Sequence, residues 1–253
     1  MHHQFRQRLK SGQLLIGTVV TLASPEVAEI LTQVGFDWLF IDAEHAPLEA
    51  LEMQRLLQGA GTHMPCVVRV ATSEEVPIKK ALDIGAAGVI APMVNSAEQA
   101  RRVVRLAKYA PAGTRGVGLG RAQGHGMRFG EYVEQANEQT AVIVQAEHVE
   151  AVNHIETIVE VDGVDAVLVG PYDLSASLGR MGNVGHPEVI AAIEHVTEAC
   201  RGVGMPLGIF GVSPEAVNTY IERGYTLIAA GVDAMLLGRA AAEMLAQIKS
   251  GSN

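Results

Sequence analysis

The chain has 253 residues and a mass of 26.8 kDa, with 48% hydrophobic side chains, 4% aromatic ones and a formal net charge of -9. An acidic surface of this kind argues against nucleic acid or an anionic membrane as the partner, although a pocket can still be locally basic. The length suits one large core of small branched side chains, so we expect residues 1–253 to form a single domain.

The first residues and the two cysteines indicate the cellular compartment. Residues 1–12 are polar and basic and lack the apolar segment of a signal peptide. The longest uncharged apolar stretch, residues 14–23, is too short to cross a bilayer. Cys66 and Cys200 both lie in apolar runs, as buried free thiols do in a reducing compartment. These features predict a soluble cytoplasmic protein.

Eight short apolar runs alternate along the chain with longer stretches of helical period. The runs lack the polar–apolar alternation of strands with one wet face, which indicates strands covered on both sides, as in a parallel sheet. The expected strands are residues 14–20, 38–41, 66–70, 88–92, 141–145, 166–170, 207–210 and 227–229.

The stretches between these runs carry helix start and stop signals. Ser24 followed by Pro25 is a favourable helix start, and a glycine often ends a helix just before the next strand. The expected helices are residues 25–34, 48–59, 76–84, 97–107, 149–159, 187–201, 214–223 and 240–248.

Eight β/α units in about 250 residues predict an α/β fold of the (β/α)8 TIM-barrel type. A doubly wound parallel sheet is the alternative, although nothing in that architecture would stop it at eight units. No linker or low-complexity tract divides the chain. Residues 109–130, rich in glycine and arginine, are expected to form a long loop of the barrel.

Polar side chains gather at the ends of the predicted strands, where the active sites of TIM barrels lie. Going from the second strand to the seventh, these ends carry Asp42-Ala43-Glu44-His45, Arg69, Gln145-Ala146-Glu147, Gly170-Pro171-Tyr172-Asp173 and Phe210. Because the carboxyl ends of barrel strands meet at one rim, we expect these residues to surround one cavity.

Glu147 and Asp173 are the candidate metal ligands, since they end adjacent strands. Two carboxylates with open coordination positions suit a hard cation such as Mg or Mn. Each carboxylate could instead cap a helix or pair with an arginine, but their occurrence together at one rim favours metal.

His45 and Arg69 are the candidates for acid–base chemistry and anion binding. Imidazole titrates near neutral pH, so His45 could act as a general base, or it could be a loop histidine bonded to backbone. Arg69 could bind a carboxylate or stabilise an enolate, or it could pair with Asp42 or Glu44.

The lysines exclude one class of mechanism. Aldolases that form a Schiff base need a lysine in the barrel, and none lies in a predicted strand or at its end. The five lysines are Lys10, Lys79, Lys80, Lys108 and Lys249. A reaction through a carbanion would therefore need a metal ion. A phosphate site at Gly238-Arg239, at the start of the last predicted helix, has weaker support.

Five motifs, in order along the chain, resemble those of the HpcH/HpaI class II pyruvate aldolases, which include aldolases of 4-hydroxy-2-oxoheptanedioate and 5-keto-4-deoxy-D-glucarate. The motifs are Phe40-Ile-Asp-Ala-Glu-His-Ala-Pro47, Val67-Val-Arg69, Arg115-Gly-Val-Gly118, Val144-Gln-Ala-Glu147 and Gly170-Pro-Tyr-Asp-Leu-Ser175. The resemblance runs from about residue 12 to residue 246. It implies a barrel of the phosphoenolpyruvate/pyruvate superfamily type.

The resemblance also implies roles for individual residues. Glu147 and Asp173 would bind one divalent cation, Mg, Mn or Co. His45 would be the acid/base, Asp83 would raise its basicity, and Arg69 would stabilise the enolate.

Further residues would contact the substrate or the neighbouring subunits. Gln145 and the backbone of Tyr172 and Asp173 would contact the 2-oxo acid, and Phe210 would close the rim with an apolar ring. Such enzymes are hexamers, with the last helix, here about residues 240–249, exchanged between neighbours. The resemblance thus implies a homo-oligomer whose ligands are a 2-oxo acid and an aldehyde.

Two departures from the family pattern concern the substrate. Tyr172 stands where a small residue is common, and residues 119–129, expected to face the aldehyde, have their own composition. The expected reaction is reversible aldol addition of pyruvate or hydroxypyruvate to an aldehyde, acting on 4-hydroxy-2-oxo acids. A CoA-thioester lyase of the citramalyl type, a non-catalytic barrel that binds a keto acid and a phosphate-binding isomerase are the alternatives.

Overall fold

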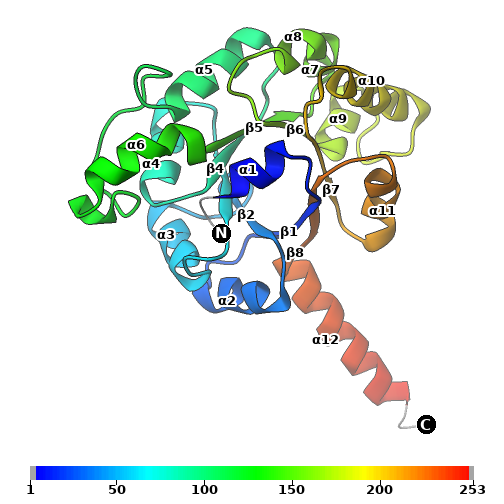
Figure 1. Ribbon diagram of the computed structural model, residues 1–253. Helices are drawn as coiled ribbons and strands as arrows, with labels where there is room; N and C mark the ends of the chain where they lie inside the picture. The colour runs from blue at the N-terminus through cyan, green and yellow to red at the C-terminus, as the bar shows by residue number, and fades with distance from the viewer. Residues whose placement is uncertain (1–3, 251–253) are drawn as a thin grey trace.

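The structure is a computed structural model that describes residues 4–250. Eight parallel strands close into a barrel in sequence order, because β1 pairs with β8 as well as with β2 (Figure 1). This closure confirms the TIM-barrel prediction and rules out the doubly wound sheet. The strands are β1 (Leu15–Val20), β2 (Trp38–Asp42), β3 (Cys66–Arg69), β4 (Gly88–Ala91), β5 (Ala141–Ala146), β6 (Ala166–Val169), β7 (Leu207–Gly211) and β8 (Leu227–Val232).

All the predicted helices are present. The expected helix over residues 149–159 is interrupted at His154, and the last helix begins seven residues earlier than predicted. The helices are α2 (Pro25–Val34), α3 (Ala50–Gly59), α4 (Glu75–Asp83), α5 (Ala97–Ala107), α7 (Val149–Asn153), α8 (Ile155–Val159), α10 (Pro187–Val203), α11 (Pro214–Glu222) and α12 (Asp233–Ser250). At the start of α2, the Ser24 hydroxyl accepts a hydrogen bond from the backbone N–H of Val27, as the sequence signal predicts.

Four further helices were not predicted. They are α1 (Phe5–Lys10), the 3-10 helix η2 (Gly124–Gly126), α6 (Phe129–Gln139) and α9 (Pro171–Ser177). Three of them are short, and only α6 has a length at which helical periodicity is informative. The expected loop over residues 109–130 is present, with η2 inside it.

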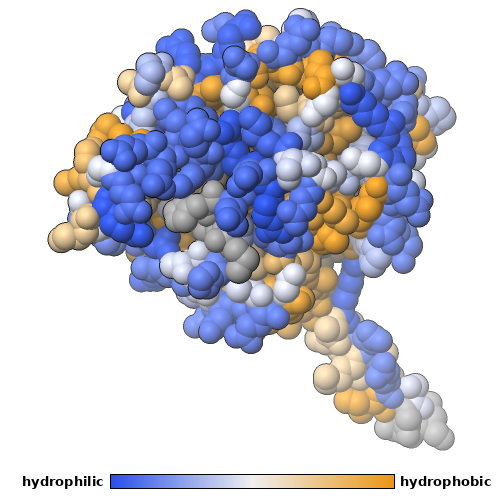
Figure 2. Space-filling model, viewed as in Figure 1, coloured by the Kyte–Doolittle hydropathy of each residue, from blue (hydrophilic) through white to orange (hydrophobic). Residues whose placement is uncertain are grey.

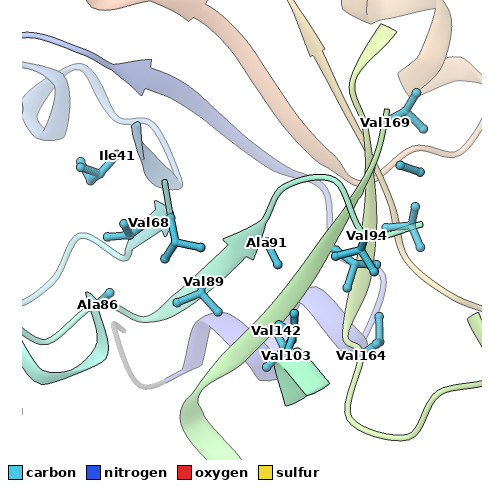
Figure 3. Packing of buried hydrophobic residues seen from close by; sticks show 14 of the residues in the cluster. Ile41, Val68, Ala86, Val89, Ala91, Val94, Val103, Val142, Val164 and Val169 are labelled. Atoms are coloured by element: carbon cyan, nitrogen blue, oxygen red, sulfur yellow. The ribbon is translucent and has the colours of Figure 1, made fainter. Parts of the chain in front are cut away.

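Two apolar clusters form the core. The inner one fills the barrel with side chains from the strands, including Trp38 and Phe40, and the outer one lies between the strands and the surrounding helices. Figure 3 shows part of the outer cluster, where Val142 of β5 lies beside Val103 of α5, and Val68 and Val89 lie on β3 and β4. The continuous apolar runs in the sequence therefore reflect strands buried on both faces.

Helix α1 closes the amino-terminal end of the barrel. Phe5 and Leu9 are fully buried in the inner cluster, and the Phe5 ring centroid lies 6.0 Å from that of Trp38. Nε of Arg6 donates to both carboxylate oxygens of Asp165 at 2.9 Å, which ties the helix to the start of β6. In Figure 1 this helix lies across the barrel. The barrel is consequently plugged at this end.

Helix α12 projects away from the barrel as an arm (Figure 1). Its first residue, Asp233, is buried and accepts hydrogen bonds from the backbone N–H of Thr21 and of Leu22. Farther along, Leu237 is 65% exposed and Met244 is 64% exposed, and Figure 2 shows apolar and hydrophilic residues on different sides of the arm. Across residues 4–250 we find no helix that combines the length and apolarity needed to span a membrane.

Replacing Phe5 with alanine should lower the free energy of unfolding by about 3–5 kcal/mol, because it leaves a cavity in the plug of the barrel. Urea denaturation followed by circular dichroism measures the effect. Val34→Ala is the control: Val34 is 68% exposed, so its loss should cost no more than about 0.5 kcal/mol. Equal stability of the Phe5→Ala variant and the wild type would contradict the role assigned to α1.

Candidate functional site

A cavity of about 180 Å³ opens at the carboxyl-terminal ends of the strands. Six of the predicted site residues line it: His45, Arg69, Gln145, Tyr172, Asp173 and Phe210. The rest of its wall consists of Val19, Thr21, Phe40, Asp42, Leu168, Val169, Gly170, Pro171 and Val232. Barrel closure thus brings together residues that lie in or follow seven different strands.

Glu147, the seventh predicted residue at this rim, lies directly beside the cavity and is only 3% exposed. It packs against Gly170, at which an added Cβ would lie 2.8 Å from the Glu147 Oε2 atom. A side chain at position 170 would therefore collide with the carboxylate. The glycine at the end of β6 allows this close approach.

Arg69 and Asp42 form a paired ion bridge at the ends of β3 and β2. Nε and one terminal nitrogen of the guanidinium donate to the two oxygens of Asp42 at 2.9 and 2.8 Å. The other terminal nitrogen lies 3.3 Å from a carboxylate oxygen of Glu44. Burial would raise the pKa of Asp42, but the hydrogen bonds and charge of Arg69 outweigh it and hold this pKa below its ordinary value. The ion pair considered for Arg69 from the sequence is therefore formed.

His45 lies at the rim of the cavity. Its side chain is 63% exposed, and Nε2 lies 3.8 Å from Oε2 of Glu44. The backbone N–H of His45 donates to Asp42 Oδ1 at 3.3 Å, whereas the imidazole makes no hydrogen bond to the backbone within residues 4–250. The alternative of a histidine held by backbone is thus not what the structure contains, and the ring is free to meet a substrate.

Glu147 is a buried carboxylate with an unusual protonation equilibrium. Its Oε1 accepts a hydrogen bond from the backbone N–H of Met93 at 2.8 Å, and Oε2 accepts one from the Gln145 amide. The pKa of Glu147 is raised to about 7, mainly by burial and also by the charges of Glu44 and Asp173, while the Met93 hydrogen bond and Arg69 oppose the shift. Burial, together with two neighbouring carboxylates, therefore disfavours the charged form of Glu147 when no cation is bound.

A buried carboxylate next to other carboxylates is typical of a metal site whose cation is not bound. Glu147 and Asp173 offer oxygen ligands, and Oε1 of Gln145 is buried without a hydrogen-bond partner. Within residues 4–250 no group of three or more His, Cys, Asp or Glu side chains is arranged to hold a metal. Two carboxylates fit a cation that keeps open positions for water and substrate, as Mg and Mn do.

Asp83 does not lie at the rim that contains the cavity. It ends α4, and because barrel helices run opposite to their strands, this position is at the amino-terminal rim. Its Oδ1 accepts a 2.8 Å hydrogen bond from Arg115, a residue of another predicted motif, whose guanidinium lies over the ring of Tyr109. Within one chain Asp83 therefore lies at the opposite rim from His45. It cannot raise the basicity of His45 in the same chain.

Residues 119–129 lie at the same amino-terminal rim. The backbone N–H of Ala122 donates to the Asp83 carbonyl at 2.9 Å, and Arg121 donates to the Ile84 carbonyl at 3.0 Å. Within one chain this loop does not border the cavity at the opposite rim. It can face an aldehyde only in the site of another copy of the chain.

The phosphate site considered at Gly238-Arg239 was wrong. These residues lie inside α12 and not at its start, because the helix already begins at Asp233. Arg239 donates to the Val212 carbonyl at 2.7 Å, and the first turn contains a buried carboxylate, which repels anions. The phosphate-binding isomerase thereby loses its support.

Met93 contributes to the site although it is not among the residues that the sequence predicts. Its φ of 53° lies in the left-handed region, which is uncommon for residues other than glycine, and this conformation accompanies the hydrogen bond from its N–H to Glu147. No sequence signal marks such a position. Thr21, which lines the cavity and is held by Asp233, was also missed.

Comparisons with known proteins agree with this geometry. The family model "HpcH/HpaI aldolase/citrate lyase" matches residues 15–240. A hydroxypyruvate/pyruvate aldolase from Pseudomonas aeruginosa is 41% identical over 99% of this chain and 94% of its own length. A 4-hydroxy-2-oxo-heptane-1,7-dioate aldolase from Klebsiella pneumoniae subsp. pneumoniae is 42% identical over 98% of this chain and 94% of its own. The crystal structure of an HpcH/HpaI aldolase/citrate lyase family protein from Burkholderia cenocepacia J2315 superimposes with a TM-score of 0.93 at 38% identity, covering 98% of this chain and 99% of that one.

Without added metal, the protein should become more stable as the pH falls from about 8 to about 5, because protonation of Glu147 removes a buried charge. The folded protein, with a pKa of about 7 against the ordinary 4.5, holds this proton more tightly than the unfolded chain. The contribution is complete below the ordinary pKa and is lost as the pH rises through 7. It amounts to at most about 3 kcal/mol.

The free energy of urea unfolding, measured across this pH range in the presence of EDTA, tests the expectation. The wild type should show the added pH dependence and Glu147→Gln should lack it. The same pH dependence in both proteins would mean that another group titrates.

Proposed function

Because the chain belongs to the HpcH/HpaI aldolase/citrate lyase family, we propose that it is a metal-dependent aldolase that joins pyruvate or hydroxypyruvate reversibly to an aldehyde. Its substrates in the cleavage direction are 4-hydroxy-2-oxo acids, and it is a carbon–carbon lyase of the cytoplasm. The observation that supports the proposal is the position of Asp173, His45 and Arg69 around one cavity at the carboxyl end of the barrel, with the Glu147 carboxylate packed against Gly170 of its wall.

Glu147 and Asp173 are the proposed ligands of one divalent cation, Mg, Mn or Co. When bound, the cation stabilises negative charge on the 2-oxo oxygen as a Lewis acid. Among residues 4–250 no lysine borders the cavity, so the Schiff-base alternative has no amine there. The raised pKa of Glu147 supports the assignment, since a cation offsets the repulsion from the neighbouring carboxylates.

The keto acid is held by Gln145 and by the backbone of Tyr172 and Asp173 in this proposal. All three residues border the cavity. Gln145 is positioned by its hydrogen bond to Glu147, which leaves its buried amide oxygen without a partner. The residues proposed to bind the keto acid and the proposed acid–base residue His45 thereby border the same cavity.

His45 removes a proton from C3 of the keto acid in the addition direction. Its exposed imidazole borders the cavity, and its Nε2 lies 3.8 Å from Oε2 of Glu44. The carbon nucleophile then attacks the aldehyde carbon, and the new alkoxide receives a proton from His45. Cleavage follows the same steps in reverse, with His45 taking the proton of the C4 hydroxyl.

Arg69 stabilises the enolate oxygen. A guanidinium has five N–H groups, and the two hydrogen bonds to Asp42 engage two of them, so donors remain for substrate. The ion pair with Asp42 also fixes the plane of the guanidinium. The guanidinium carbon also lies over the ring of Phe40, 5.2 Å from its centroid.

A homo-hexamer completes the proposal. Asp83 can reach His45 only from another copy of the chain, because the two residues occupy opposite rims of one barrel. Helix α12 extends from the barrel with exposed apolar side chains such as Leu237 and Met244, which suits exchange with a neighbour. In the proposed assembly, both Asp83 and the loop 119–129 act on a neighbouring site.

Glu147→Gln should reduce aldol turnover at least about 100-fold and weaken Mn binding, because it removes a charged ligand while keeping the shape of the side chain. Turnover is measured with pyruvate and an aldehyde panel in Mg, Mn or Co, with EDTA as the metal-free reference, and binding by calorimetry. Glu150→Gln, the same change at an exposed position three residues away, is the control. A fully active Glu147→Gln protein would remove the metal site from the proposal.

His45→Ala should slow the exchange of the C3 protons of pyruvate in D2O by about 10²–10⁴-fold, since a positioned base contributes rate acceleration of this size. Mn affinity should stay within about twofold of wild type, because His45 is not a proposed ligand. Proton NMR of pyruvate measures the exchange, with the exposed His63→Ala as control. Unchanged exchange in His45→Ala would refute the base assignment, and absence of exchange in the wild type would favour a non-catalytic or CoA-dependent protein.

A further inference from the structure

Arg115, the first residue of the motif Arg115-Gly-Val-Gly118, has a fully buried side chain at the amino-terminal rim of the barrel. Its guanidinium carbon lies 4.5 Å from the ring centroid of Tyr109 and 5.6 Å from that of Tyr132. One terminal nitrogen donates a 3.1 Å hydrogen bond to the Tyr132 hydroxyl. Because Tyr109 follows α5 and Tyr132 belongs to α6, the elements on both sides of the loop hold the guanidinium in place.

The other terminal nitrogen of Arg115 holds Asp83 by one carboxylate oxygen. It donates to Oδ1 at 2.8 Å, and the Gln123 amide lies 3.5 Å from the same oxygen. In the described part of the chain, residues 4–250, no group donates to Oδ2 of Asp83. Gly118 lies beside this second oxygen, since an added Cβ there would be 3.4 Å from it. Asp83 thus keeps one oxygen available on a buried support.

The backbone of Asp83 is joined to the loop independently of Arg115. Its carbonyl oxygen accepts the 2.9 Å hydrogen bond from the Ala122 N–H, and an added Cβ at Gly120 would lie only 2.7 Å from the same oxygen. This close approach requires a glycine. Loss of the Arg115 side chain should therefore remove the support of the carboxylate without releasing the main chain of the loop.

A second ion pair at the same rim shows what a purely structural pair looks like. Asp165 accepts from Arg6 with both carboxylate oxygens, and its side chain is 1% exposed. Asp83 accepts from Arg115 with one oxygen, and its side chain is 25% exposed. A buried arginine needs an anion in either case, but only the Asp83 pair leaves a carboxylate oxygen for another partner.

We propose that Arg115 is a positioning residue that holds Asp83 for its action on His45 of a neighbouring copy of the chain. The inference rests on the proposed function, in which Asp83 reaches His45 across a subunit contact. A carboxylate that acts on an imidazole must keep one orientation, and an unsupported aspartate side chain moves between rotamers. Arg115 itself contacts no substrate and works only through Asp83.

A double-mutant cycle on the exchange of the C3 protons of pyruvate in D2O, with saturating Mn, is the first test. Arg115→Met should slow the exchange by about 10–100-fold, because displacement of a positioned group costs rate on this scale. In an Asp83→Asn background the same change should cost no more than about twofold further, since the carboxylate that it supports is already absent. An equal loss in both backgrounds would mean a general structural role and would overturn the inference.

The matched control is Arg101→Met, at a half-exposed arginine that pairs only within its own helix, 3.5 Å from Glu98. It should leave the exchange rate within about twofold of wild type. If Arg115→Met does not fold, Arg115→Lys takes its place, because it keeps the charge but lacks the planar donor group. Full exchange in a folded Arg115→Lys and Arg115→Met would contradict the proposal.

The second test joins two impaired variants in one assembly. His45→Ala and Arg115→Met chains are co-expressed with different tags, and oligomers that carry both tags are purified. A site is intact where the Arg115→Met chain supplies His45 and the His45→Ala chain supplies Asp83 with its Arg115. Under equal, random mixing about a quarter of the sites should exchange at the wild-type rate. Mixed oligomers no faster than the two parent variants would refute the action of Arg115 on a neighbour.

Failure of the inference can be separated from failure of the proposed function. His45→Ala mixed with Asp83→Asn tests the shared site without Arg115, and His45→Ala mixed with Glu147→Gln is the negative control, because both changes fall in the site of one chain. Recovery with Asp83→Asn but not with Arg115→Met would refute only the inference. No recovery in either mixture would refute the shared site and the inference with it. Absence of exchange in the wild type would refute the aldolase as well.

Discussion

A single guanidinium, that of Arg69, faces four carboxylates at the carboxyl end of the barrel. It binds Asp42 through two hydrogen bonds and lies near Glu44, but the burial of Glu147 beside Glu44 and Asp173 leaves charge without compensation. The pKa of Glu147, raised to about 7, expresses this imbalance. A divalent cation between Glu147 and Asp173 would balance the charge, so the ion pair and the proposed metal site are two parts of one electrostatic arrangement.

The barrel concentrates this arrangement at one end. Strand pairing around the whole barrel, from β1 back to β8, aligns the carboxyl ends at one rim, while α1 fills the other end with Phe5 and Leu9. Gly170 lets β6 approach the Glu147 carboxylate, and Asp233 ties the base of α12 to Thr21 in the cavity wall. The hydrogen bond between Asp233 and Thr21 therefore joins the first turn of α12 to the cavity wall of the same subunit.

Most of the site residues predicted from the sequence are polar side chains at the end of a strand that an apolar run predicts. His45, Arg69, Gln145 and Asp173 were found in this way, and all four border the cavity. Met93 escaped because its role depends on a backbone N–H in a left-handed conformation. Asp83 lies at a helix end on the opposite rim, where it pairs with Arg115, so one chain does not bring it to His45.

The amino-acid sequence by itself determined the eight strands, most of the helices and the barrel they form, because strands buried on both faces and helices with capping residues leave a local pattern. It also determined which kinds of side chain stand at the strand ends. Only the tertiary structure decided that Arg69 pairs with Asp42 and that Glu147 is buried with a raised pKa. It also decided that the rings of Tyr172 and Phe210 lie next to each other at a tilted angle. These properties depend on distances between residues that are remote in the sequence, and barrel closure sets those distances.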